Sequence, residues 1–234
     1  MKSIFKALVP VAFAILLIPS CSKEKSSEQK KENFELKAGD LLFQDLDCGP
    51  VCDAIEAVTQ GTDGARLSHV GIVSRIKDGK VYITEAFGES VKEVGFDDFM
   101  SRSSDKKGNP KVLAGRIRLN EGLMARDMGE LTSLIGHKYD VAFDISDDKY
   151  YCSELVYEVF RDEKNRPIFE LKAMTFKDPK TGKTMEAWAK YFKDIKTKIP
   201  EGGMGINPGL ISRYSYVDIV HAYGCPEGWS KCKY

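Results

Sequence analysis

The chain of 234 residues has only three histidines, and this scarcity limits the chemistry that it can perform. Any mechanism in which an imidazole moves a proton must use His69, His137 or His221. Acidic and basic residues balance at 35 each, so the formal net charge is zero and nothing indicates nucleic-acid binding. No internal repeat is present. The sequence therefore points to an ordinary globular chain in which one of few histidines carries any proton transfer.

Long hydrophobic runs are also lacking. The apolar stretch from Ala7 to Ile18 is too short for a comfortable transmembrane span, and Lys2 and Lys6 precede it. A positive start, a short apolar segment and a small residue are typical of a secretory signal. The run 18–21, Ile-Pro-Ser-Cys, resembles a bacterial lipobox, which predicts that Cys21 is lipidated and becomes the new N-terminus. Plain secretion is the main alternative, and a transmembrane anchor is a weaker one.

Residues 22–35 are charged, rich in serine and poor in apolar side chains, which is typical of a solvated tether. We therefore expect a signal peptide over 1–20, a tether over 21–35 and one domain over 36–234. The domain is large enough to bury a core without extra cross-links. Its expected location is the bacterial cell envelope, extracytoplasmic and attached to the membrane by a lipid anchor.

Six cysteines are present, and an extracytoplasmic compartment permits disulfides. With Cys21 and Cys152 set aside, four remain, and four cysteines allow three pairings. Cys225 and Cys232 flank a short Pro-Glu-Gly-Trp loop, and Cys48 and Cys52 flank Gly49-Pro50, so each pair could close locally. A zinc site with four thiolates is a further alternative.

Cys152 opens a run whose apolar residues recur at helical spacing, which predicts a helix over 152–160. Asp147 and Asp148 lie upstream, where an N-cap is expected. A cysteine in the first helical turn feels the positive end of the helix dipole, which favours the nucleophilic thiolate. A small buried core residue is the alternative role for Cys152.

Strands and helices are partly segregated along the chain, and the turn signals indicate antiparallel hairpins, so we expect an α+β fold. Strands are expected near 41–43, 69–73, 81–86, 112–119 and 216–222, with an extended segment over 167–171. Helices are expected over 52–59, 121–135, 152–160 and 185–192.

His69 begins one strand of the hairpin that Asp78-Gly79 closes, and Glu85 lies in the returning strand. With a two-residue turn, Glu85 points to the opposite face of the sheet from His69. With a three-residue turn, or with a β-bulge, Glu85 becomes the diagonal neighbour of His69 on the same face. A catalytic partnership therefore requires the longer turn or a bulge.

Three segments together carry a resemblance: Gly39 to Gln44, Ser68 to Val73, and Tyr151 to Val156. In this order they resemble the YiiX/YebB-like branch of the NlpC/P60 superfamily, whose members are circularly permuted papain-like cysteine hydrolases. The resemblance runs from about Leu36 to about Tyr223. It implies a cysteine-bearing helix packed on an antiparallel sheet that carries the histidine.

The resemblance implies Cys152 as nucleophile, His69 as base and Glu85 as the residue that orients the imidazole, with Glu89 as a nearby acidic alternative. We expect no cofactor and no metal. The backbone N–H of Cys152 is a natural oxyanion donor because it is unpaired in the first helical turn. Gln44 and Tyr151 are candidates for a second donor. Tyr139, Asp140 and Phe143 are candidates for lining the cleft.

The implied partner is an amide- or ester-containing envelope substrate: a peptide, a peptidoglycan fragment or a lipid. Three alternatives stay open. An unpermuted papain-like site would use Cys52 with Gln44 and His221. A lipid acyl hydrolase or acyltransferase would use the same Cys152 chemistry. A non-catalytic envelope-binding lipoprotein would keep the fold without turnover. His137, at a predicted helix end, and His221, in a predicted strand, are otherwise expected to be structural.

The lipid anchor is testable at Cys21. Cys21→Ser should leave the precursor unprocessed or release the protein from membranes, because the lipid can no longer be attached. Fractionation with intact-mass measurement reads both outcomes. A Cys21→Ser protein that is matured and fractionates like the parent would show that the lipobox prediction is wrong.

Overall fold

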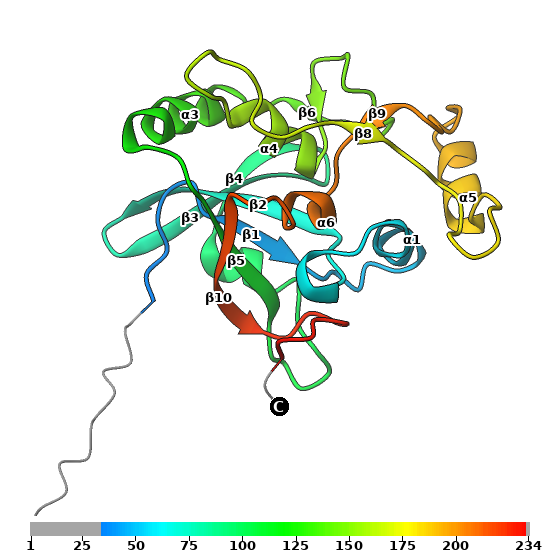
Figure 1. The fold of residues 1–234 in the computed structure, drawn as a ribbon, viewed down its shortest axis with the longest axis horizontal. Helices are drawn as coiled ribbons and strands as arrows, with labels where there is room; N and C mark the ends of the chain where they lie inside the picture. Colours follow the sequence, from blue (N-terminus) through cyan, green and yellow to red (C-terminus); the bar gives the residue numbers. More distant parts are fainter. Residues whose placement is uncertain (1–33, 233–234) are drawn as a thin grey trace, which may run out of the picture. The chain divides into compact units, whose positions relative to one another are not determined.

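The computed structural model describes residues 34–232. The predictions for the signal peptide, Cys21 and most of the tether lie outside these residues. Eight strands form one sheet in the order β10-β5-β1-β2-β3-β4-β6-β7, and all neighbours are antiparallel except β6 and β7 (Figure 1). These strands are β1 (Leu41–Gln44), β2 (His69–Lys77), β3 (Lys80–Phe87), β4 (Ser90–Gly95), β5 (Lys111–Ile117), β6 (Lys138–Tyr139), β7 (Lys149–Tyr150) and β10 (Val217–Gly224).

Six helices accompany this sheet in the described part of the chain. They are α1 (Pro50–Val58), α2 (Phe96–Met100), α3 (Glu121–Ser133), α4 (Cys152–Val159), α5 (Glu186–Asp194) and α6 (Pro208–Ile211). A short 3-10 turn spans Thr62–Gly64, and β8 (Lys172–Ala173) pairs with β9 (Met204–Gly205) in a separate ribbon. Within residues 34–232, no helix has the length and apolar character needed to cross a membrane.

The two faces of the sheet carry different hydrophobic clusters. Leu41 and Phe43 of β1 join a cluster that includes Leu155 and Val156 of α4, whereas Leu42 joins a cluster with Phe99 and Met100 of α2. Side chains of a strand alternate between faces, so a β1 that is apolar at successive positions must be covered on both sides. Helix α4 packs against β2, β3 and α3 (Figure 1). Helix α2 packs against β3 and β4.

The α+β prediction is confirmed, and most predicted elements match to within a few residues. Several short elements were not foreseen, among them strand β4 and helix α2; α2 has only one turn and shows no useful periodicity. In the segment predicted to be extended, 167–171, only Pro167 pairs, in a single bridge to Arg161.

The hairpin of β2 and β3 combines the two registers that the sequence left open. Lys77 pairs with Lys80, so Asp78-Gly79 is a two-residue turn and the three-residue loop is wrong. The register then shifts between Val73 and Arg75, where a β-bulge leaves Ser74 without a partner. Beyond the bulge Ile72 faces Thr84, and continuing this register places His69 opposite Phe87, with Glu85 on the same face.

Two of the segments that carry the family resemblance contain a glycine that the packing around it requires. Gly39 has φ +89°, which favours glycine, and a Cβ there would lie 2.0 Å from the sulfur of Met124. The buried carboxylate of Asp40, which follows, pairs with the partly exposed Arg116 at 2.7 Å. A Cβ on Gly71 would lie 2.6 Å from Phe99, so Gly71 lets α2 approach β2 on the face that carries His69.

Two disulfides join Cys48 to Cys52 and Cys225 to Cys232, with Cα atoms 5.5 and 5.6 Å apart. Local pairing was one of the open alternatives, and the four-thiolate zinc alternative is wrong for this structure.

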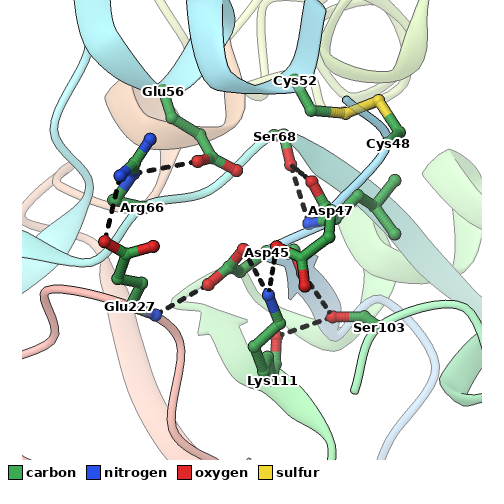
Figure 2. Close-up of polar contacts among 11 residues, drawn as sticks. Asp45, Asp47, Cys48, Cys52, Glu56, Arg66, Ser68, Ser103, Lys111 and Glu227 are labelled. Carbon is green, nitrogen blue, oxygen red and sulfur yellow. Dashed lines mark hydrogen bonds and ion pairs between the residues drawn. A yellow bond between two sulfur atoms is a disulfide. The ribbon is translucent and has the colours of Figure 1, made fainter. Parts of the chain in front are cut away.

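A buried polar network lies beside the first disulfide (Figure 2). Lys111 Nζ donates to both Asp45 and Asp47 at 2.8 Å. Ser103 Oγ donates to the carbonyl of Asp45 at 2.8 Å and to that of Lys111 at 3.1 Å. Ser68 Oγ accepts the backbone N–H of Leu46 at 2.9 Å, next to His69 in the chain. The network therefore ties the end of β1, the start of β2 and the segment after α2 to one another.

Candidate active site

Cys152 is the first residue of α4 and the one free cysteine among residues 34–232. Tyr151 is the N-cap, and the carboxylate of Glu154 accepts its backbone N–H at 3.2 Å. The expected N-cap at Asp147 or Asp148 is therefore wrong. Those residues lie before β7, whose pairing with β6 delays the helix by several residues. The position of Cys152 in the first helical turn is as predicted, and the helix dipole acts on its sulfur.

The structure brings Cys152, His69 and Glu85 together, and all three are buried. His69 Nε2 donates to Oε2 of Glu85 at 2.7 Å. The Cys152 sulfur lies close enough to the His69 ring and to the backbone N–H of Val70 for both to lower the pKa of its thiol. Because Nε2 is engaged by Glu85, Nδ1 is the ring nitrogen left for the sulfur. The imidazole thus stands between a thiol and a carboxylate.

Opposing effects set the ionisation of these groups. Burial alone raises the pKa of Cys152, but the hydrogen bond and charge of His69 outweigh it and lower the pKa. Burial lowers the pKa of His69, but its bonds to Cys152 and Glu85 outweigh this and raise the pKa to about 9. For Glu85, burial raises the pKa, whereas His69 and then Arg102 lower it overall. These directions favour a thiolate, an imidazolium and a carboxylate near neutral pH.

Arg102 also belongs to this site, although no motif or spacing in the sequence singles it out. Its Nη2 donates to both oxygens of Glu85, at 2.6 and 2.7 Å. The guanidinium lies 4.3 Å from the ring centroid of Phe87 and 5.3 Å from that of Phe99. A buried carboxylate needs compensation, but the pattern around Glu85 does not say which of the many cations supplies it.

Glu154 lies in the same helical turn as Cys152, yet it adds little negative charge near pH 7. Burial, together with the charges of Asp140, Asp147 and Glu158, raises its pKa to about 8 against the hydrogen bond from Tyr151 N–H. A mostly neutral Glu154 still accepts that bond, so it caps α4 without opposing a thiolate at Cys152.

Gln44 and Tyr151, the two candidates for a second oxyanion donor, form hydrogen bonds with other backbone groups. Gln44 Nε2 donates to the carbonyl of Phe99 at 2.8 Å. The hydroxyl of Tyr151 accepts the backbone N–H of Ile206 at 3.1 Å. The backbone N–H of Cys152 remains the donor that the first turn of α4 provides.

The three candidates for lining the cleft differ in their roles. Tyr139 lies close enough to Cys152 for burial and the sulfur's charge to raise the pKa of its hydroxyl. Asp140 is fully buried and accepts the backbone N–H groups of Ala142 and Asp144 at 2.7 and 2.5 Å, so it shapes the loop instead. Phe143 packs edge-on against Tyr151 at 5.2 Å and belongs to the core.

The remaining titratable candidates lie outside this arrangement. Cys52 is held in a disulfide, which removes the thiol that an unpermuted papain-like site needs. His221 stacks on Phe34 with ring centroids 4.3 Å apart. His137 pairs with Asp148 at 3.1 Å. Glu89 is exposed and contributes its backbone carbonyl to the N–H of Tyr139 at 2.9 Å.

A cysteine at the start of a helix, facing a histidine and a carboxylate on an antiparallel sheet, defines a papain-like thiol-enzyme arrangement. Residues 35–208 match the family model described as permuted papain-like amidase enzyme, YaeF/YiiX, C92 family. The chain belongs to this family of permuted papain-like amidases, and the predicted resemblance and permuted fold are confirmed.

Two relatives illustrate the similarity. The uncharacterized protein YiiX of Escherichia coli K12 is 30% identical over 133 residues, which cover 55% of this chain and 59% of that protein. The crystal structure of the metalloprotein YiiX from Escherichia coli O157:H7 superposes with a TM-score of 0.65 at 21% identity. That match covers 81% of this chain and 98% of the other, and at this identity it supports the fold alone.

The alkylation rate of Cys152 by iodoacetamide at pH 7 tests the arrangement. His69→Ala should slow it by about tenfold or more, because the thiol loses the cation that lowers its pKa. Glu85→Gln should slow it less, since a neutral amide still accepts the bond from Nε2. Glu89→Gln is the matched control and should react like the parent. Equal rates in the parent and His69→Ala would remove His69 from the site.

Proposed function

We propose that this chain is an envelope-anchored cysteine hydrolase of amidase or peptidase type, with Cys152 as nucleophile, His69 as base and Glu85 as the orienting carboxylate. The observation that carries the proposal is the buried contact of His69 with Cys152 on one side and with Glu85, at 2.7 Å, on the other. Membership in a family of papain-like amidases supports amide chemistry.

In the proposed mechanism the Cys152 thiolate attacks the carbonyl carbon of the substrate, and the carbonyl π electrons move onto oxygen. The backbone N–H of Cys152 stabilises this oxyanion. The His69 imidazolium then gives its proton to the leaving amine, and the C–N bond breaks to leave an acyl-enzyme. A water molecule, deprotonated by neutral His69, hydrolyses the thioester and restores the thiolate and the imidazolium.

Glu85 contributes by fixing the ring and by stabilising its positive charge. Its bond to Nε2 leaves Nδ1 directed toward the sulfur, so the proton is held at the nitrogen that faces the leaving group. General acid–base catalysis, the step that Glu85 supports through His69, typically contributes about 100- to 10,000-fold in rate.

A related protein is named as a metalloprotein, so a metal site must be considered for this chain. Within residues 34–232, no three or more His, Cys, Asp or Glu side chains are grouped so that they could hold a metal ion. The described donors do not fit a metal, and no step of the proposed mechanism uses one.

The proposed substrate is an amide of the cell envelope, such as a peptide or a peptidoglycan fragment, reached from a lipid anchor at Cys21. Lipid esters are a second substrate class for the same acyl-enzyme chemistry. The family description favours amides over esters.

Product analysis tests this proposal. Envelope extracts are incubated with the parent or with Cys152→Ala, and new amines, carboxylic acids and free fatty acids are identified by mass spectrometry. The parent should release amine and carboxylate products, and Cys152→Ala should release none, while thermal melting confirms that it is folded. Fatty acids as the only products would favour the lipid alternative. Identical products from both proteins would contradict the proposed nucleophile.

A further inference from the structure

We propose that Arg102 is a positioning residue of this site: it holds both oxygens of Glu85 and supplies the positive charge that keeps this buried carboxylate ionised beside His69. The inference rests on the proposed function, because it assigns a role within the same site. Arg102 has no sequence motif around it, and it enters the site through the fold alone.

The contacts of the carboxylate are the first argument. Glu85 has no exposed surface, and one oxygen bonds both His69 Nε2 at 2.7 Å and Arg102 Nη2 at 2.7 Å. The other oxygen bonds Arg102 at 2.6 Å. A carboxylate gripped at both oxygens cannot rotate, so the oxygen that faces Nε2 stays fixed. A buried charge without such partners would be strongly disfavoured.

The placement of the guanidinium is the second argument. Phe87 lies opposite His69 in the continued β2–β3 register, and the guanidinium of Arg102 stands 4.3 Å from the Phe87 ring centroid. The His69 ring contacts the same Phe87 at 5.2 Å between centroids. Phe87 therefore contacts both groups that bond Glu85, and its ring face favours the guanidinium cation that lies over it.

The backbone that carries Arg102 is itself immobilised, which is the third argument. The next residue, Ser103, is buried and donates to the carbonyls of Asp45 and Lys111 (Figure 2). The backbone N–H of Lys111 donates back to the carbonyl of Ser103 at 3.0 Å. The network beside the first disulfide thus holds the segment after α2 in place, and a rigid support of this kind is what a positioning residue needs.

Charge determines what the loss of Arg102 should do. With Arg102 present, the charges of the Cys152 thiolate, the His69 imidazolium, the Glu85 carboxylate and the Arg102 guanidinium sum to zero. Without it the site carries one net negative charge, so protons are held more tightly by both Cys152 and His69. Besides each other, Cys152 and His69 are faced by Glu85 on β3, Tyr139 on β6, Tyr151 before α4 and, through Glu85, Arg102 after α2; Lys92 on β4 lies opposite Glu85.

The test is the pH profile of Cys152 alkylation by iodoacetamide, read by mass spectrometry on the peptide that contains Cys152. In Arg102→Gln both the acidic and the alkaline limb should move upward by about one pH unit. A residue with only a structural role would lower the melting temperature without moving the limbs. Arg102→Lys keeps the charge and should hold both limbs within a few tenths of a unit.

Arg75→Gln is the matched control, because Arg75 of β2, like Arg102, pairs with a glutamate and lies over an aromatic ring. Arg75 pairs with Glu93 at 2.6 Å and lies 3.6 Å from the ring centroid of Tyr82. Its profile should match the parent.

A folded Arg102→Gln with parental limbs would overturn the inference. If Arg102→Gln does not fold, Arg102→Lys decides alone, and limbs displaced by a whole unit in that variant would overturn it. A parent protein whose Cys152 is unreactive at every pH would instead contradict the proposed function itself, so the two failures are distinguishable.

Discussion

The site depends on one constraint: the carboxylate of Glu85 is completely buried and therefore has to be neutralised on two sides. His69 and Arg102 do this at 2.7 and 2.6 Å. The first contact fixes the imidazole, and the second is made by a residue held on the segment after α2. Without the second cation, the imidazolium alone would have to compensate the carboxylate as well as the proposed thiolate.

The fold brings these groups together from elements that are far apart in sequence. The bulge at Ser74 turns His69 and Glu85 onto one face, which a regular two-residue hairpin would not do. Gly71 lets α2 pack closely on that face, and α2 leads directly to Arg102. Helix α4 packs on β2 and β3 and presents its first residue, Cys152, to the start of β2. Each of the three segments that carry the family resemblance therefore has a steric or electrostatic role in building the site.

Local signals were enough to predict the cysteine helix and the histidine strand, because periodicity is encoded over short stretches, whereas the permuted fold was implied by the family resemblance of three ordered motifs. The N-cap was wrong because the acidic residues before α4 precede a two-residue strand whose partner, β6, is set by tertiary structure. The hairpin register was left open, since nothing in the Asp78-Gly79 turn requires a bulge at Ser74. Arg102 was missed for the same reason: its partner Glu85 is 17 residues away and joined only by folding.

The central claim is that His69 is held as an imidazolium between Cys152 and Glu85 at neutral pH. The most direct measurement is a 15N NMR titration of the imidazole nitrogens, with the His69 signal assigned by comparison with His69→Ala. Burial opposes the charge, but the two hydrogen bonds raise the pKa to about 9. His69 should therefore stay protonated on both nitrogens at pH 7 to 8, and Cys152→Ala should lower its pKa. A His69 that is neutral at pH 7 in the parent protein would contradict the account.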